Sequence, residues 1–145
     1  MPGSPFLYLH KAFVFKSRFV YIRRMQFHNY YVYLLTTSDN SVFYTGFTND
    51  LARRIVEHKV HLNKGFTDRY NITKLVYYEL FHNVDDAIKR EKQLKRYSRI
   101  WKAHLVATMN AEWNDLSETI GVTKEIIESA RNGIGVPGTS PGRQC

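Results

Sequence analysis

The sequence predicts an α+β domain in which helices flank a small three-stranded sheet, antiparallel or mixed. Three segments are rich in aromatic and β-branched residues, which favours strands: 30–35, 42–45 and 74–81. Turn-forming residues at 38–41 separate the first two strands, so these should form a hairpin and make at least part of the sheet antiparallel. Two other stretches, 48–60 and 83–97, open with residues that cap helices.

The first helix follows the hairpin directly. Thr48 and Asn49 offer N-caps for a helix that runs to about Val60, and Asp50 would be favourable in its first turn. Leu51 and Ile55 begin the apolar stripe of this helix. The hairpin should therefore lead straight into a helix that packs on the sheet.

The later helices follow the third strand. Asn83, with Asp86 three residues on, resembles a capping box that opens a helix ending near Tyr97. Another helix should cover about Ile100–Met109. The expected order is strand, strand, helix, strand, helix, helix, with the helices packed on a small sheet.

The chain divides into three parts by composition. Its 145 residues suffice for one domain with a hydrophobic core, which we assign to 28–116. Residues 117–145 should hold a short helix and a flexible Gly- and Pro-rich tail. The basic and aromatic segment 1–27 has two readings: an extension upstream of a natural start at Met25, or an arm that adds phosphate contacts.

Charge and cysteine content restrict the class of protein. A formal net charge of +8 favours an anionic partner, either nucleic acid or a membrane surface. The only cysteine, Cys145, allows no intrachain disulfide and no thiolate metal cluster, which fits a reducing compartment and a cytoplasmic location. No apolar run is long enough to cross a bilayer, and the interrupted N-terminal segment does not resemble a signal peptide.

Glu91 is the most informative single residue. It lies on the same helix face as Ala87, Ile88 and Leu94, whereas most neighbouring cations lie elsewhere. A carboxylate that points inward must be paired, protonated or bound to a metal, because burying it alone costs several kcal/mol. A structural ion pair and a metal ligand are both consistent with this pattern.

Four other residues carry groups suited to phosphate chemistry. Arg54 and His58 share a helix face and could hold a phosphate and move a proton. Tyr33 and Tyr44 lie on predicted strands, where a tyrosine usually packs with its hydroxyl at the rim. Spacing alone does not show that these residues are catalytic. It is equally consistent with Arg54 and His58 on a solvated helix surface and with Tyr33 and Tyr44 in ordinary strand packing.

A cluster of cations follows the third strand and could form a nucleic-acid-binding surface or a solvated face. Its members are Lys89, Arg90, Lys92, Lys95, Arg96 and Arg99. Other chemistries find little support, since the sequence has no Gly-rich phosphate loop, no His-x-x-x-His or Cys-x-x-Cys pattern and no nucleophile elbow.

Several short segments of the sequence, taken in their order along the chain, resemble the GIY-YIG nuclease superfamily, and within it the small single-domain bacterial members. The segments that carry the resemblance are Tyr30–Leu35, Phe43–His58, Gly65–Thr67, Leu75–Glu79, Ala87–Lys95 and Trp113–Leu116. Each short motif is weak, but their order is specific. Tyr31, Thr45 and Phe47 depart from the family's usual glycine, isoleucine and lysine, while both motif tyrosines are present.

The resemblance implies an active site on the sheet, built from Tyr33, Tyr44, Arg54, His58 and Glu91. Glu91 would be the metal ligand and would hold one Mg²⁺ or Mn²⁺. The implied function is metal-dependent endonuclease cleavage of nucleic acid, with DNA as the expected partner, in repair or processing. No membrane partner and no small-molecule cofactor are expected.

The resemblance implies hydrolysis that leaves a 5′-phosphate and a 3′-hydroxyl. Tyr33, Tyr44 and His58 are all candidates for the general base. The alternative function is a binding module of the same fold that has lost catalysis. The sequence does not indicate whether the substrate is DNA or RNA, or whether it is single-stranded or duplex. It also does not indicate the oligomeric state.

Overall fold

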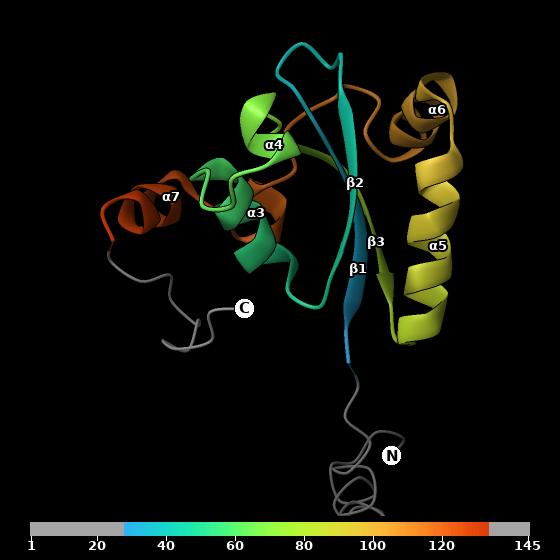
Figure 1. The fold of residues 1–145 in the computed structure, drawn as a ribbon, viewed down its shortest axis with the longest axis horizontal. Helices are drawn as coiled ribbons and strands as arrows, with labels where there is room; N and C mark the ends of the chain where they lie inside the picture. The colour runs from blue at the N-terminus through green and yellow to red at the C-terminus, as the bar shows by residue number, and fades with distance from the viewer. Residues whose placement is uncertain (1–27, 134–145) are drawn as a thin grey trace, which may run out of the picture.

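The computed structural model describes residues 28–133, and the segments 1–27 and 134–145 lie outside the described part (Figure 1). The expectations for the N-terminal extension and the Gly- and Pro-rich tail fall on those segments. The elements are β1 (Tyr30–Thr36), β2 (Phe43–Thr48), α3 (Leu51–Lys59), α4 (Phe66–Arg69), β3 (Lys74–Phe81), α5 (Val84–Arg96), α6 (Arg99–Met109), the 3₁₀ turn η1 (Glu118–Ile120) and α7 (Lys124–Arg131).

The sheet has three strands in the order β2-β1-β3, and both pairings are antiparallel. The predicted α+β class is therefore confirmed, with an antiparallel sheet. The pairing of β1 with β3 is irregular: Leu34 pairs with Tyr77 but Leu35 pairs with Leu75. Val76 is the additional residue in this bulge, so Val76 and Tyr77 are both buried in the same hydrophobic cluster.

Helices cover both faces of the sheet (Figure 1). α3, α4 and α7 lie on one side, and α5 and α6 lie on the other. Alternation along β1 supplies both cores, because successive strand residues point to opposite faces. Tyr33 and Leu35 join the core beneath α3, whereas Val32 and Leu34 join the core beneath α5.

The helix starts follow local capping chemistry. Asp50, which we expected in the first turn of α3, is the N-cap residue itself, and its side chain accepts a hydrogen bond from the Arg53 backbone N–H at 3.0 Å. Thr48 is instead the last residue of β2. Asn83 caps α5 as predicted and accepts a hydrogen bond from the Asp85 backbone N–H at 2.8 Å.

The segment after Leu116 packs on the α3 side of the sheet. The backbone N–H of Leu116 donates to the carbonyl of Leu75 at 2.8 Å. Val122 is 2% exposed and belongs to the core, and Ile126 and Ile127 of α7 pack against it. The ordered fold thus continues past residue 116, where the composition placed the end of the domain. Across 28–133, no helix has the length and apolar character required to span a membrane.

Candidate active site

Tyr33 and His58 form the buried centre of the site. Tyr33 is fully buried on the α3 side of β1, and its hydroxyl is hydrogen-bonded to His58 Nε2 at 3.1 Å. His58 Nδ1 lies 3.2 Å from the hydroxyl oxygen of Thr67, which belongs to α4. In the tautomer protonated at Nδ1, His58 donates to Thr67 and accepts from Tyr33. Tyr33 and His58 are therefore in direct contact, which their spacing in the sequence did not indicate.

Gly46 makes room for this arrangement. It pairs with Tyr33 across β1 and β2, and the Tyr33 ring lies directly over it. A Cβ at position 46 would lie 2.7 Å from Cε1 of Tyr33 and closer still to Cζ and the hydroxyl oxygen. Glycine is thus required here by close approach, and its absent side chain lets the Tyr33 ring extend across β2.

Tyr44 is the tyrosine of the site that solvent reaches. It is half-buried, whereas Tyr33 is fully buried and His58 is 6% exposed. The Tyr44 ring centroid lies 5.4 Å from that of His58 and 6.3 Å from that of Tyr33. Of the three candidate bases, Tyr44 alone combines partial exposure with a place in the cluster.

Arg54 is held by a carboxylate that the sequence reading did not single out. Its Nη1 donates to Glu57 Oε2 at 2.7 Å, and Nη1 of Arg53 donates to the other carboxylate oxygen at 2.5 Å. Burial is the largest single influence on the pKa of Arg54 and lowers it, but the interactions with Glu57 and Tyr33 together outweigh burial and raise that pKa, so the guanidinium stays charged. The i,i+3 spacing of Arg54 and Glu57 could have indicated this pair.

Burial keeps the Tyr33–His58 pair neutral. Desolvation raises the pKa of Tyr33 above its ordinary value, and the nearby Tyr44 adds to this effect, while Arg54 opposes it. Desolvation also lowers the pKa of His58 to about 4, helped by the positive charge of Arg54. His58 therefore loses the advantage that an ordinary histidine pKa would give a general base.

Glu91 lies on α5, on the opposite side of the sheet from α3 (Figure 1). Its side chain is 15% exposed and forms an ion pair with Lys95. Among the described residues no hydrogen bond or ion pair joins Glu91 to Tyr33, Tyr44, Arg54 or His58. The structure thus brings four of the five predicted site residues to one face and leaves the fifth on the other.

A pocket lies at the end of the sheet where β1 begins and β2 ends, and residues of both α3 and α5 line it. It has a volume of about 440 Å³ and is lined by Tyr30, Phe47, Thr48, Asn49, Arg53, Arg54 and Val84. Arg54 reaches it from α3, and Val84 is the first residue of α5. Glu91 follows Val84 by two helical turns on the same face of α5, roughly 10 Å further along the axis. Glu91 therefore lies about two turns along α5 from the pocket.

The donor set limits how a metal could bind. No group of three or more His, Cys, Asp or Glu side chains within residues 28–133 could hold an ion alone. Mg²⁺ at phosphate sites is usually held by one or two carboxylates, with phosphate oxygens and water as the other ligands. Glu91 offers one such carboxylate, so it fits an ion shared with a bound phosphate and requires Lys95 to release it.

The predicted basic surface contains both ion-paired and exposed cations. Arg90 forms an ion pair with Glu79 of β3, in which Arg90 Nη2 lies 2.8 Å and Nε 3.0 Å from the carboxylate. Lys95 pairs with Glu91, but its side chain remains 57% exposed. The other four residues of the set are exposed: Lys89, Lys92, Arg96 and Arg99.

Asn110, the residue that caps the C-terminal end of α6, has a structural role in this fold. It is 6% exposed, and its Nδ2 donates to the carbonyls of Val76 at 3.2 Å and Asn114 at 2.8 Å. Its Oδ1 accepts from the Asn114 backbone N–H. These bonds fix the turn after α6 to β3.

A family model described as the GIY-YIG catalytic domain matches residues 29–103. The UPF0213 protein CPE1444 of Clostridium perfringens is 34% identical over 92 residues, which cover 63% of this chain and 98% of that protein. The UPF0213 protein HQ_3675A of Haloquadratum walsbyi is 37% identical over 76 residues, 52% of this chain and 84% of that protein. The solution NMR structure of the UPF0213 protein BH0048 from Bacillus halodurans covers 66% of this chain and 99% of its own, with 30% identity and a TM-score of 0.41. Since the family model matches more than half of the length of this chain, the chain belongs to the GIY-YIG nuclease superfamily.

Proposed function

We propose that this protein hydrolyses phosphodiester bonds in nucleic acid, as a metal-dependent endonuclease acting on DNA. The observation that carries the proposal is the joint placement of Tyr33, Tyr44, His58 and Arg54 on the α3 side of β1 and β2. Membership of the superfamily supports the same reaction class. A tyrosine hydroxyl, a neutral imidazole and a charged guanidinium together supply proton transfer and phosphate binding.

In the proposed reaction Tyr44, acting as its phenolate, orients the attacking water and takes its proton. The water oxygen forms a bond to phosphorus while the bond from phosphorus to the 3′-oxygen breaks, and a solvent water gives the departing 3′-oxygen its proton. The products are a 5′-phosphate and a 3′-hydroxyl. Tyr44 is preferred to Tyr33 because its partial exposure lets it meet water, whereas Tyr33 is fully buried. Tyr33 and His58 act as positioning residues that fix the Tyr44 ring by contact.

Arg54 binds the scissile phosphate and neutralises charge that develops during attack. In the free protein its guanidinium is bonded to Glu57, which holds it at the edge of β2. A guanidinium has five N–H donors, so Arg54 can keep Glu57 and still bind a phosphate. Glu57 is thus a positioning residue whose loss would let the Arg54 side chain move.

Glu91 would hold the divalent ion through one carboxylate oxygen, after exchange of its Lys95 partner. When bound, Mg²⁺ or Mn²⁺ would act as a Lewis acid toward the phosphate and the departing 3′-oxygen. The exposed cations Lys89, Lys92 and Arg96 lie on the same helix and would contact the nucleic-acid backbone. Arg90 is left out of this proposed surface because Glu79 engages it.

Cleavage of labelled DNA by the full chain tests the proposal. We expect strand breaks with Mg²⁺, none with EDTA, and products that a ligase accepts through their 5′-phosphate. Arg54→Ala should lower turnover by roughly 10²–10³-fold, with a smaller loss of affinity. Tyr44→Phe should retain the fold and the affinity but lose most of the turnover.

Lys124→Gln is the matched control, since it removes an exposed charge from the start of α7, and Lys124 belongs neither to the pocket lining nor to the cluster around Tyr33 and His58. It should cleave like the wild type. DNA binding by the wild type without cleavage under any metal condition would instead identify a catalytically inactive binding module.

A further inference from the structure

The pocket at the edge of β2 combines aromatic, amide and cationic groups. The rings of Tyr30 and Phe47 are nearly parallel, with centroids 5.9 Å apart and an interplanar angle of 14°. Both residues are half-buried, so part of each ring remains exposed at the pocket. Planar aromatic surfaces of this kind can stack on a nucleobase, and every base offers a face for such a contact.

The opposite wall supplies phosphate-binding groups. Arg53 and Arg54 share the single carboxylate of Glu57, and each donates to it through Nη1. Asp50 is the other acid near this pair, 3.8 Å from Nε of Arg53, and its side chain also caps α3. Each guanidinium keeps N–H donors for another anion. Arg53, whose side chain is 39% exposed, is thus available to a second phosphate beside the one proposed for Arg54.

The size of the pocket restricts its ligand. A volume of about 440 Å³ lies in the lower part of the range of small-molecule sites, roughly 300–1,000 Å³. A volume of this size accommodates one nucleotide. Asn49, an exposed residue on its rim, can donate to and accept from the edge of a base.

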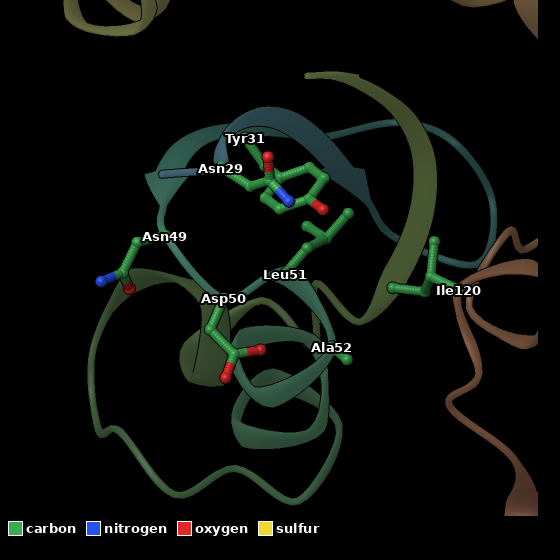
Figure 2. A pocket seen from close by; sticks show the side chains of 7 residues that line it. All are labelled: Asn29, Tyr31, Asn49, Asp50, Leu51, Ala52 and Ile120. Atoms are coloured by element: carbon green, nitrogen blue, oxygen red, sulfur yellow. The ribbon is translucent and has the colours of Figure 1, made fainter. Parts of the chain in front are cut away.

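A neighbouring pocket provides a contrast. Figure 2 shows this second pocket, of about 250 Å³, lined by Asn29, Tyr31, Asn49, Asp50, Leu51, Ala52 and Ile120. It shares Asn49 with the first pocket, but its one charged side chain is the carboxylate of Asp50. A phosphate would be repelled there, so the chemistry of an anionic nucleotide favours the pocket with the two arginines.

We infer that the larger pocket binds an unpaired nucleotide next to the scissile phosphate, with its base against Tyr30 and Phe47 and its phosphate on Arg53. This inference rests on the proposed nuclease function, because Arg54 would bind the scissile phosphate at the same pocket. The base must leave a duplex to enter. The substrate class is therefore single-stranded nucleic acid, or a strand splayed apart at a junction, flap or end.

Binding and cleavage by the full chain test this inference separately. Affinity for a fluorescent oligothymidylate is measured by anisotropy in EDTA, with one abasic residue placed at successive positions along the oligonucleotide. With the wild type, one abasic position should weaken binding roughly tenfold, as expected for the loss of one base stack. In Phe47→Leu, which keeps apolar bulk but lacks a planar ring, that position should no longer differ from its neighbours.

Phe47→Tyr should restore the position-dependent loss, and thermal melting checks that each variant is folded. Arg53→Gln should weaken binding and lower its salt dependence, whereas the charge-matched Lys124→Gln should change binding less. Equal affinity for all abasic positions in the wild type would overturn the inference, as would an unchanged pattern in Phe47→Leu. If either of these results appears but the protein still cleaves DNA with Mg²⁺, the inference about the pocket fails and the proposed nuclease function stands. If binding depends on the abasic position but no cleavage occurs, the pocket stands and the proposed nuclease function fails.

Discussion

Replacing Gly46 with alanine should disrupt the centre of the site. The new Cβ would lie 2.7 Å from Cε1 of Tyr33, whereas carbon atoms in contact are about 3.5–4.0 Å apart. The ring must therefore move by about 1 Å, yet it is fully buried and its hydroxyl is already 3.1 Å from His58 Nε2. A shift of this size stretches the hydrogen bond beyond the usual limit.

The expected cost follows from these contacts. Overpacking costs roughly 1–3 kcal/mol, and loss of a hydrogen bond about 1 kcal/mol, while reduced freedom of the unfolded chain returns about 0.5–1 kcal/mol. We expect Gly46→Ala to lower the unfolding free energy by about 2 kcal/mol and the melting temperature by roughly 10 °C. Displacement of Tyr33 and Tyr44 should reduce cleavage by about 10²-fold.

Thermal melting and single-turnover cleavage measure the two effects. Gly65→Ala is the matched control, because a Cβ there meets no atom within 4 Å. A smaller side chain at position 33, in Gly46→Ala/Tyr33→Leu, should recover part of the stability lost in the single Gly46 variant. Wild-type melting and turnover in Gly46→Ala would refute the role assigned to close contact.

Three further predictions follow from single groups. Glu91→Gln should abolish cleavage and weaken Mg²⁺ binding, while melting and metal-free DNA affinity stay near wild type. His58, with a pKa of about 4 when folded and an ordinary value of 6.5, should contribute stability that is complete above pH 6.5 and is lost as the pH falls toward 4. Urea unfolding should therefore show up to about 3 kcal/mol more acid destabilisation in the wild type than in His58→Gln. Arg90→Ala should lower the unfolding free energy by roughly 2–3 kcal/mol, because it strands the half-buried carboxylate of Glu79, whereas Lys89→Ala should leave stability unchanged and weaken DNA binding.

Local patterns in the sequence predicted much of the fold. The three strands, the cap at Asn83 and the hairpin all follow from side-chain alternation and turn chemistry. The cap of α3 was misplaced by one residue or two, because Thr48, Asn49 and Asp50 all have capping side chains and only the end of β2 decides among them. The packing of α7 on α3 depends on tertiary contacts of Ile126 and Ile127, for which composition gave no signal.

The candidate site was predictable as a set of residues but not as a geometry. Helical spacing places Arg54 and His58 on one side of α3, but the contact of His58 with Tyr33 depends on how α3 sits over β1. The inward stripe of α5 identified Glu91 as shielded, and the side chain is 15% exposed. Helical periodicity has no information about which face of the sheet a helix covers, so it could not place Glu91 opposite the other four residues.

The bulge in β3 has an electrostatic consequence for the site. In a regular strand Leu75, Tyr77 and Glu79 would all point to one face, the side of Arg53 and Arg54. The extra residue Val76 shifts this alternation, so Tyr77 and Glu79 point to the α5 side, where Glu79 binds Arg90. The bulge thus keeps a negative charge away from the face that would receive phosphate, because regular pairing of the same residues would turn Glu79 to that face.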